Sequence, residues 1–314
     1  MKQRDGQPVE GKTAAIIGFF DGVHLGHQAL LRRLLEVSRE GGLLPTVLTF
    51  DPHPAAVLQP DRAPLLLTSL AQKEALLRST GVAKVVHLPF DRSFASLSPR
   101  EFALFLVSAL KVGWVGIGFN FRFGVGGTGH PETMASLGEE LGFGVEVLPS
   151  QKVAGRVVSS SLIRQVLSAG RVEEAARFLG RPYSVTGTVI KGDGRGRTIG
   201  YPTANVEVAP TQLLPKAGVY AVKGALAVGA WSGAANLGVR PTFTNEGQLQ
   251  LEVHLIDWEG DLYGQELEVA FHHRLRAEKA FASPSELGEQ LAKDIQAATA
   301  FFGFNCMEEH EVLK

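Results

Sequence analysis

The feature that most restricts the fold is an alternation of short apolar runs with amphipathic stretches between Thr13 and about Gly170. The apolar runs are TAAIIGFF, LLPTVLTF, VAKVVHL, VGWVGIG and FGVEVL. The helical patterns lie near His27–Glu40, Ser69–Ser79, Pro99–Leu110, Pro131–Leu141 and about Ser160–Ala169. Because continuous apolar strands alternate with helices, this half predicts an α/β fold with a parallel sheet covered on both faces.

After Pro182 the pattern changes to short β-like runs separated by Gly, Pro and Asn turns, with no helical pattern between them. These runs are YSVTGTVIKG, GVYAVKGALAV, WSGAANLG, QLQLEVHLID and QELEVAF. They predict an antiparallel sheet or small barrel, and a helical pattern at about Pro284–Phe301 predicts a terminal helix. We therefore predict two domains, of residues 1–182 and 183–314.

The overall composition excludes several classes of protein. Hydrophobic residues make up 45% of the chain and charged residues 20%, as in soluble globular proteins. A net charge of −1 does not favour electrostatic binding to nucleic acid or to an anionic membrane. Neither a signal peptide nor a run of about 18 apolar residues is found. The single cysteine, Cys306, cannot form an internal disulfide, so we expect a cytoplasmic protein.

The most informative motif of the first half is GFFDGVHLGH, which joins a predicted strand to a predicted helix. Such a junction presents free backbone N–H groups and the positive end of a helix dipole, which favour an anionic phosphate. Gly22 and Gly26 allow tight turning and close approach of a ligand. His24 and His27 are three residues apart and can point toward one spot. A metal pair or simple packing is the alternative, but no third ligand follows at helical spacing.

A glycine-rich segment in the second half, KGDGRGRTIGYPTANVE at 191–207, is a second candidate for phosphate binding. Gly192, Gly194 and Gly196 supply flexible backbone N–H groups that suit a loop folding over phosphates. The segment is not a P-loop, because no helical pattern follows it. A mobile hairpin loop is the alternative interpretation.

Polar residues on predicted strands extend this second candidate. Thr203 and Asn205 are two apart, so their side chains face the same way, and their hydroxyl and amide oxygens suit Mg²⁺. Local hydrogen bonding at a sheet edge is the alternative. In QLQLEVHLID, Glu252 shares a face with Gln250 and His254, opposite the apolar face. Alternation alone favours a solvated strand residue at Glu252.

Four stretches of the first half together resemble a known family: GFFDGVHLGH, TFDPHP at Thr49, GFNFRFG at Gly118 and VSSSLIRQVL at Val158. The first resembles the HxGH signature of nucleotidyltransferases, and the four resemble the N-terminal domain of bacterial bifunctional riboflavin kinase/FAD synthetase. The resemblance implies a Rossmann-like nucleotidyltransferase sheet that transfers AMP from ATP to FMN, forming FAD and pyrophosphate. The attacking phosphate is already an anion, so alignment and charge neutralisation suffice without a general base.

The resemblance also implies roles for individual residues. His24 and His27 would donate hydrogen bonds to ATP phosphates, and Arg164 would clamp an anion. Asn120 would help to place nucleotide or flavin, and Mg²⁺ would bridge phosphates. The expected ATP-binding residues are Gly18, Phe19, Asp21, Gly22, Gly26 and Ser160. The expected flavin-binding residues are Asp51, Pro52, His53, Pro54 and Asn120.

Motifs of the second half resemble riboflavin kinase over about residues 183–300: GRGRTIGYPTAN, AGVYAV, AANLGVRPTF, LEVHLID, DLYGQELEV and RLRAEKAFASPSEL. The resemblance implies a small closed barrel that transfers the γ-phosphate of ATP to the 5′-hydroxyl of riboflavin. That nucleophile is a neutral alcohol that needs a proton acceptor, and Glu252 matches the family's general base. Thr203 and Asn205 match its Mg²⁺ ligands. The other matches are phosphate-binding Gly192, Gly194, Gly196 and Arg197 and flavin-binding Arg276, Glu278 and Phe281.

The sequence thus predicts a bifunctional enzyme that uses ATP and Mg²⁺ to convert riboflavin to FMN and then FMN to FAD. The family often has Asp where Asn120 stands, and the loop from Gly124 to His130 lacks the family's usual basic residue and Gly-Asp. One alternative therefore keeps the kinase but has a weak or differently specific adenylyltransferase half. Another is a flavin-binding regulator without catalysis. The sequence predicts small-molecule substrates and no particular oligomeric state.

Overall fold

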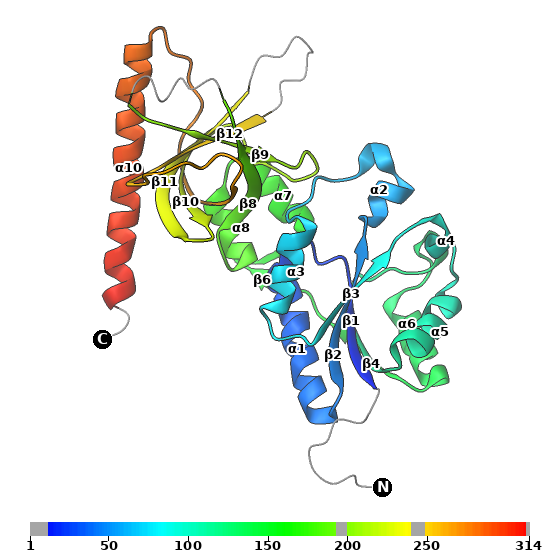
Figure 1. Cartoon of the computed structure of the whole chain (residues 1–314). Coiled ribbons are helices and arrows are strands. Elements are labelled where there is room, and N and C mark those ends of the chain that lie inside the picture. The colour runs from blue at the N-terminus through cyan, green and yellow to red at the C-terminus, as the bar shows by residue number, and fades with distance from the viewer. Residues whose placement is uncertain (1–11, 193–199, 240–248, 312–314) are drawn as a thin grey trace. The chain divides into compact units, whose positions relative to one another are not determined.

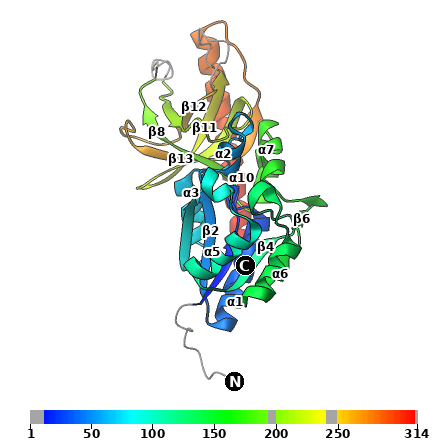
Figure 2. The same cartoon turned by 90° about the vertical axis from the view of Figure 1, so that its right-hand side faces the viewer.

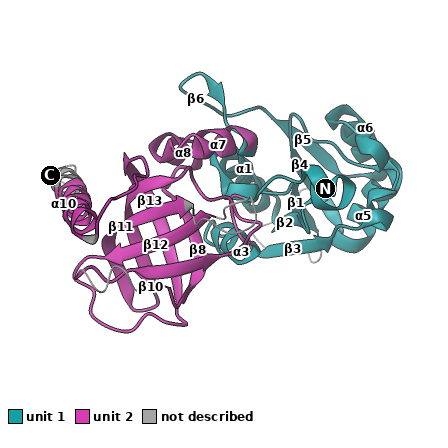
Figure 3. Ribbon diagram, turned by 90° about the horizontal axis from the view of Figure 1, so that it is seen from above, with its two compact units in different colours: residues 1–66, 70–160 teal, residues 67–69, 161–314 magenta. Residues whose placement is uncertain are grey.

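The computed structural model describes residues 12–192, 200–239 and 249–311. The chain divides into two compact units, one of residues 1–66 and 70–160 and the other of residues 67–69 and 161–314 (Figure 3). Each unit is built around its own sheet. Within the described ranges, no helix has the length and apolar character needed to cross a membrane.

The first unit contains a parallel sheet with the strand order β3-β2-β1-β4-β5 (Figure 1). Its strands are β1 (Thr13–Ile17), β2 (Leu44–Asp51), β3 (Lys84–Pro89), β4 (Val112–Gly118) and β5 (Gly144–Leu148). The direction in which strands are added reverses between β1 and β4. Ligands of open α/β sheets bind at such switch points, beyond the carboxyl ends of the strands.

Helices cover both faces of this sheet, because successive strand residues point to opposite sides. The main helices are α1 (Leu25–Gly41), α3 (Leu70–Arg78), α5 (Pro99–Leu110) and α6 (Pro131–Leu141). On one face α1 and α3 pack with Ala14 and Ile16. On the other face α5 and α6 pack with Ala15 and Ile17. The sheet is therefore the middle layer of a three-layer unit, as the sequence predicted.

Shorter elements occupy the connections of the first unit. They are η1 (Asp21–Val23), α2 (Pro54–Leu58), η2 (Pro60–Arg62), α4 (Arg92–Ala95), η3 (Val125–Gly127), β6 (Lys152–Val153) and β7 (Arg156–Val157). Strands β6 and β7 form a small antiparallel hairpin that projects from the unit (Figure 2). Elements η1, α2 and η3 follow β1, β2 and β4, so they lie at the edge where the switch point predicts a ligand.

The second unit is a closed antiparallel barrel in the order β10-β11-β12-β9-β8-β13, with β13 paired back to β10. Its strands are β8 (Tyr183–Ile190), β9 (Ala204–Val208), β10 (Gly218–Leu226), β11 (Gly229–Val239), β12 (Leu249–Leu255) and β13 (Glu266–Arg276). Along β12, Leu251 and Val253 are buried, whereas Glu252 and His254 on the opposite face are only partly buried. The predicted alternation therefore separates a barrel interior from an outer polar face.

The remaining helices of the described residues are α7 (Ser160–Ser168), α8 (Val172–Leu179) and α10 (Pro284–Glu311). Glu173 of α8 accepts a hydrogen bond from the backbone N–H of Arg274 in β13 at 3.0 Å. Ala298 of α10 packs with Ala221 and Ala234 on the outside of the barrel. The predicted parallel sheet, antiparallel barrel and terminal helix are confirmed, and α10 continues ten residues beyond the predicted end at residue 301.

Candidate functional sites

The first candidate site is the turn that joins β1 to α1. Phe20, Gly22 and Val23 have φ angles of 57°, 79° and 40°. Positive φ is strained for residues such as Phe and Val, and this strain clusters at ligand-binding turns. Phe20 and Val23 are held there by packing in the core beneath α1 and α3. A side chain at Gly18 would come within 3.3 Å of the Phe20 ring.

His24 caps the helix that follows this turn. Its Nδ1 accepts a hydrogen bond from the backbone N–H of His27 at 3.3 Å. Because Nδ1 is the acceptor, a neutral His24 carries its proton on Nε2, which is then the donor atom. His24 is 6% exposed, so the cap fixes both its tautomer and its orientation.

The two predicted histidines lie together. Their rings stack with centroids 3.6 Å apart and an interplanar angle of 14°. Burial, His24 and Lys73 lower the pKa of His27 well below its ordinary value of 6.5, so His27 is neutral at neutral pH. Among the described residues, the buried Nδ1 of His27 has no hydrogen-bond partner. A buried nitrogen without a partner is uncommon in native structures and marks the position as a candidate for function.

Predicted ATP-binding residues of the first unit also meet at this turn. The Ser160 hydroxyl donates a hydrogen bond to the Asp21 carbonyl at 2.9 Å, which fastens the start of α7 to the turn. Asp21 itself is 3% exposed. A side chain at Gly26 would come within 3.1 Å of the His24 ring. Glycine at this position therefore leaves room for the imidazole. Arg164 lies one turn further along α7 and is partly buried.

A cavity of about 290 Å³ opens in the first unit between the segment after β2 and the loop after β4. Its aromatic lining consists of Phe50, Phe90, Phe94, Phe102, Phe121 and Phe123. Gly124, Gly126 and Gly127 complete one wall, so the loop that departs from the family pattern borders this cavity. An apolar, aromatic cavity of this size suits a flat ring system.

The predicted flavin-side segment at the end of β2 borders the same cavity through Pro54. His53 begins α2, because its Nδ1 accepts the backbone N–H of Ala55 at 2.9 Å. The His53 ring also meets the Phe19 ring edge-on, with centroids 4.2 Å apart and an angle of 69°. The structure therefore brings a predicted flavin-side residue against a predicted ATP-side residue.

Three further predicted residues are exposed: Asp51 and Pro52 at the end of β2, and Asn120 after β4. Strands β2 and β4 flank β1, so both segments open at the carboxyl edge of the sheet. In the loop that follows Asn120, the Arg122 guanidinium contacts the His130 ring. That contact closes the loop on itself at the position where its sequence departs from the family.

The second candidate site lies on the outer face of the barrel, where three polar residues fall in register on adjacent strands. Asn205 of β9 pairs with Glu252 of β12, and Glu252 pairs with Asn236 of β11. Directly opposed residues of antiparallel strands point to the same face. The Glu252 carboxylate is therefore flanked by two side-chain amides, and all three residues are partly buried.

Asn205, Glu252 and Asn236 form a row across three strands, and the backbone approaches this row closely at two glycines. A Cβ at Gly192 would collide with the side-chain amide of Asn205. A Cβ at Gly238 would lie 2.7 Å from Oε1 of Glu278 and 3.1 Å from Nδ2 of Asn236. Two predicted residues from distant segments, Gly192 and Glu278, are thereby brought to the row. Side chains at either glycine would displace the polar groups.

His254 fixes the predicted metal-binding segment. Its Nδ1 lies 2.9 Å from the carbonyl oxygen of Pro202, and this hydrogen bond requires the ring to donate. His254 is two residues from Glu252 and shares its face of β12. The bond holds the backbone at Pro202, directly before Thr203, and so fixes the start of the segment that carries Thr203 and Asn205. Hydroxyl, amide and carboxylate oxygens of this kind fit a Mg²⁺ ion.

The predicted flavin-side residue Arg276 is held by the terminal helix. Its guanidinium makes a two-pronged ion pair with Asp294 of α10, with Nε–Oδ1 and Nη2–Oδ2 distances of 2.9 and 2.7 Å. Asp294 is 4% exposed and also accepts a hydrogen bond from Gln290 at 3.0 Å. The Arg276 guanidinium lies 5.8 Å from the centroid of the Phe281 ring. Arg276 therefore anchors the segment that carries Glu278.

Some predictions cannot be placed, and some residues were not predicted. Gly194, Gly196 and Arg197 lie outside the described residues. Sequence reasoning did not single out Asn236, Asp294 or the aromatic lining, and it noted His254 only as a neighbour of Glu252. The alternation of QLQLEVHLID was a usable signal for His254, whereas the partners of Asn236 and Asp294 come from distant segments.

Two family models match the chain in the same order as the two units. The first, described as FAD synthetase, matches residues 7–162, and the second, described as riboflavin kinase, matches residues 179–302. The crystal structure of a protein from Streptococcus pneumoniae described as a macrolide-efflux protein has a TM-score of 0.83 and 32% identity. It covers 92% of this chain and 93% of its own.

Curated relatives cover nearly the whole chain. A bifunctional riboflavin kinase/FMN adenylyltransferase from Listeria monocytogenes is 40% identical over 287 residues, 91% of each chain. One of the same description from Escherichia coli strain K12 is 41% identical over 299 residues, 94% of each chain. With both family models matched in order, the chain belongs to the bifunctional riboflavin kinase/FMN adenylyltransferase family.

Proposed function

We propose that this protein phosphorylates riboflavin to FMN in its barrel unit and adenylylates FMN to FAD in its parallel-sheet unit, with ATP as the donor in both reactions. The observation that carries the proposal is the different chemistry of the two sites. A carboxylate, Glu252, faces Asn205 in the barrel, whereas a stacked imidazole pair, His24 and His27, stands at the sheet edge. Only the kinase reaction needs a proton acceptor.

In the parallel-sheet unit we assign alignment and charge neutralisation to the residues around the β1–α1 turn. Nε2 of His24 donates to an oxygen of ATP, and the first backbone N–H groups of α1 add their positive potential. Neutral His27 stacks on the His24 ring and keeps it in place beside the same anion. Arg164 acts as an anion clamp, by the family resemblance. The flavin ring occupies the aromatic cavity that Pro54 and Phe121 border.

In the barrel unit the 5′-hydroxyl of riboflavin is the nucleophile. Glu252 takes its proton as the bond to the γ-phosphorus forms, and ADP leaves with the broken phosphoanhydride oxygen. Asn205 and Asn236 on either side of Glu252 orient the carboxylate and the substrate. Glu278, beside Asn236, faces the flavin side of the same row.

We infer that Thr203 and Asn205 hold Mg²⁺ in the kinase site, where the ion neutralises phosphate charge. Their hydroxyl and amide oxygens suit the ion, and the bond from His254 to the Pro202 carbonyl keeps them in place. In the adenylyltransferase site Asn120 offers one amide oxygen near the switch point. We assign the two activities to residues 1–182 and 183–314, in a cytoplasmic enzyme that acts on small molecules.

The decisive experiment follows products over time. Purified protein is given riboflavin, ATP and Mg²⁺, and FMN and FAD are separated chromatographically at intervals. We expect FMN first and FAD later, with Mg²⁺ chelation stopping both. FMN formation with no FAD, even from added FMN, would favour a kinase whose other half acts on a different phosphate ester. Flavin binding without either product would make the protein a regulator.

A further inference from the structure

Lys73 is a buried lysine that belongs to none of the motifs. It lies on α3 and is only 3% exposed. Lysine is almost never fully buried unless its ammonium is paired. The surroundings of Lys73 therefore require an explanation beyond packing, and they consist of the ends of β1 and β2.

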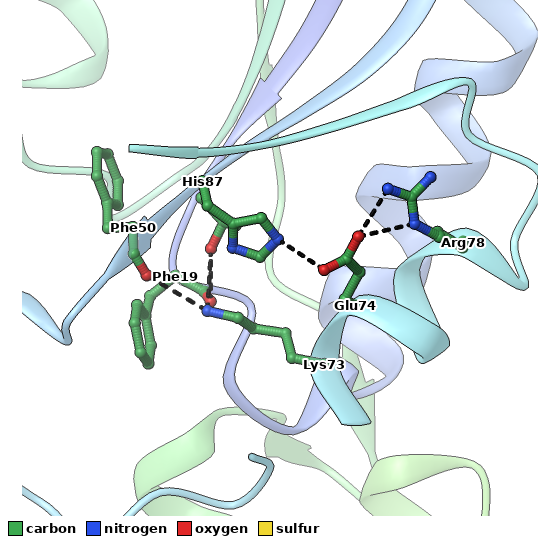
Figure 4. A network of polar contacts seen from close by, with 7 residues as sticks. Phe19, Phe50, Lys73, Glu74, Arg78 and His87 are labelled. Carbon is green, nitrogen blue, oxygen red and sulfur yellow. Dashed lines mark hydrogen bonds and ion pairs between the residues drawn. The ribbon is translucent and has the colours of Figure 1, made fainter. Parts of the chain in front are cut away.

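A relay of hydrogen bonds starts at this ammonium. Nζ of Lys73 donates to Oγ1 of Thr49 at 3.3 Å. It also donates to the carbonyl of Phe50 at 3.4 Å (Figure 4). Oγ1 of Thr49 in turn donates to the carbonyl of Phe19 at 3.1 Å. The relay thus connects α3, the end of β2 and the turn after β1. Thr49 is 0% exposed, so water does not compete for these bonds.

The same ammonium also contacts the turn through an aromatic ring. Nζ lies 4.1 Å from the centroid of the Phe19 ring, a cation–π distance. That ring also meets the His53 ring edge-on, with 4.2 Å between the centroids. One charged group therefore holds both the segment predicted to bind ATP and the segment predicted to bind flavin.

Carboxylates near Lys73 favour a charged ammonium at this position. Burial lowers the pKa of Lys73, while Asp21 and Asp51 act in the opposite direction and favour its protonated form. Lys73 also contributes to the lowered pKa of His27, which keeps that imidazole neutral. The ammonium thus balances one carboxylate from each strand end.

We propose that Lys73 is a positioning residue for adenylyl transfer, which holds the β1–α1 turn and the end of β2 in the arrangement that aligns the FMN phosphate with the α-phosphate of ATP. The proposal rests on the adenylyl transfer proposed above. Alignment is the main requirement of that reaction, because its nucleophile is already charged. A shift of either strand end would separate the reacting atoms.

A purely structural lysine would behave differently when replaced. Met fills most of the space of the lysine stem but cannot make the hydrogen bonds or the ring contact of the ammonium. Lys73→Met therefore tests the two roles separately. A positioning role predicts a folded protein with slow FAD formation, whereas a structural role predicts that activity and stability fall together.

The experiment compares Lys73→Met with Lys84→Met, which makes the same change at an exposed position of β3. Both variants are assayed for FAD formation from FMN, for riboflavin phosphorylation and for thermal unfolding. We expect Lys73→Met to lower kcat for FAD formation about tenfold or more, with KM for ATP changed less than about threefold. Phosphorylation of riboflavin and the unfolding midpoint should match Lys84→Met.

A second variant tests the relay itself. Thr49→Val removes the shared hydroxyl but leaves the ammonium, and it should lower the same kcat. If the two residues act through one chain of bonds, the double variant will be no slower than the worse single variant. If the reductions in kcat of the two single variants multiply in the double variant, the relay is contradicted. A wild-type kcat in Lys73→Met, or a loss of FAD formation that follows unfolding, would contradict the positioning role. A wild-type protein that makes no FAD would instead refute the adenylyl transfer.

Discussion

In the mechanism that we propose, individual side chains divide the chemistry between an acceptor of protons and donors to anions. In the barrel, Glu252 is placed between the amides of Asn205 and Asn236. At the edge of the parallel sheet, the cap fixes His24 as an Nε2–H donor and burial keeps His27 uncharged. In the proposed adenylyl transfer neither imidazole has to remove a proton, so we expect both to act by orientation and hydrogen bonding.

Replacing the proposed base with its amide separates the two reactions. Glu252→Gln keeps the shape and the strand register but cannot accept the proton of riboflavin. We expect the rate of FMN formation to fall about a hundredfold or more, while FAD formation from supplied FMN stays at the wild-type rate. Glu207→Gln, the same change at an exposed position of β9, is the control for the lost charge. An unchanged kinase rate in Glu252→Gln would remove Glu252 from the mechanism.

The lowered pKa of His27 makes stability depend on pH. The unfolded chain binds a proton at the ordinary pKa of about 6.5, before the folded chain does. The free energy of unfolding therefore decreases as pH falls from about 6.5 toward the lowered pKa of the folded state, and this loss is absent at neutral pH. His27→Gln should remove that part of the dependence.

Thermal unfolding of wild type and His27→Gln at about pH 7.5 and about pH 5.5 measures this effect. The difference between their midpoints should shift in favour of the variant at the lower pH. His272, whose pKa burial also lowers, contributes equally to both proteins and cancels from the comparison. Equal midpoint differences at the two pH values would mean that His27 is not buried in its neutral form.

At the scale of elements, local sequence patterns predicted individual strands and helices. The run Thr13–Ile17 and the pattern after His27 gave the first strand and helix because each element is apolar on the face it buries. The helical patterns of the first half were predicted to end at about Ala169, yet α8 (Val172–Leu179) follows. The register of Glu252 with Asn205 and Asn236, and the cavity at Phe90 and Phe94, depend on pairing between distant segments, which no local pattern encodes.

The terminal helix has a predicted role in the kinase site through one ion pair. Asp294→Asn keeps a hydrogen-bonding group but removes the charge that holds Arg276. We expect a loss of about 2 kcal/mol in the free energy of unfolding, because Asp294 is buried and Arg276 only partly so. KM for riboflavin should rise, since the segment with Glu278 loses its anchor.

The control for this variant is Lys293→Gln, the neighbouring exposed position of α10. Urea unfolding gives the stability change, and initial rates of FMN formation give KM and kcat. FAD formation from FMN should be the same in both variants. A wild-type KM in Asp294→Asn, with the expected loss of stability, would limit α10 to supporting the barrel.

At the scale of the whole molecule, each candidate site is built chiefly from one unit. The stacked histidines, the cavity and Lys73 belong to residues 1–66 and 70–160, and the Asn205–Glu252–Asn236 row belongs to residues 161–314. The family models match in the same order, 7–162 and 179–302. FMN is the product of one reaction and the substrate of the other, so the two sites act in sequence on one compound.

Two inactive variants should therefore complement each other in a mixture. Glu252→Gln supplies an intact adenylyltransferase site, and His24→Asn supplies an intact kinase site. We expect the mixture to convert riboflavin to FAD after a lag, whereas His24→Asn alone stops at FMN and Glu252→Gln alone makes little of either product. Chromatography of the flavins over time measures this. No FAD from the mixture, when Glu252→Gln still uses added FMN, would indicate that FMN is not released.

The pairing of β13 with β10 that closes the barrel also sets an order for biosynthesis. Strand β8, the first of the barrel along the chain, pairs on one side with β13, whose last residue is Arg276. The five parallel strands are complete at Leu148. During synthesis the α/β sheet can therefore form before β13, the partner of β8, has been translated. During translation, we expect the adenylyltransferase half to be the first to become resistant to protease.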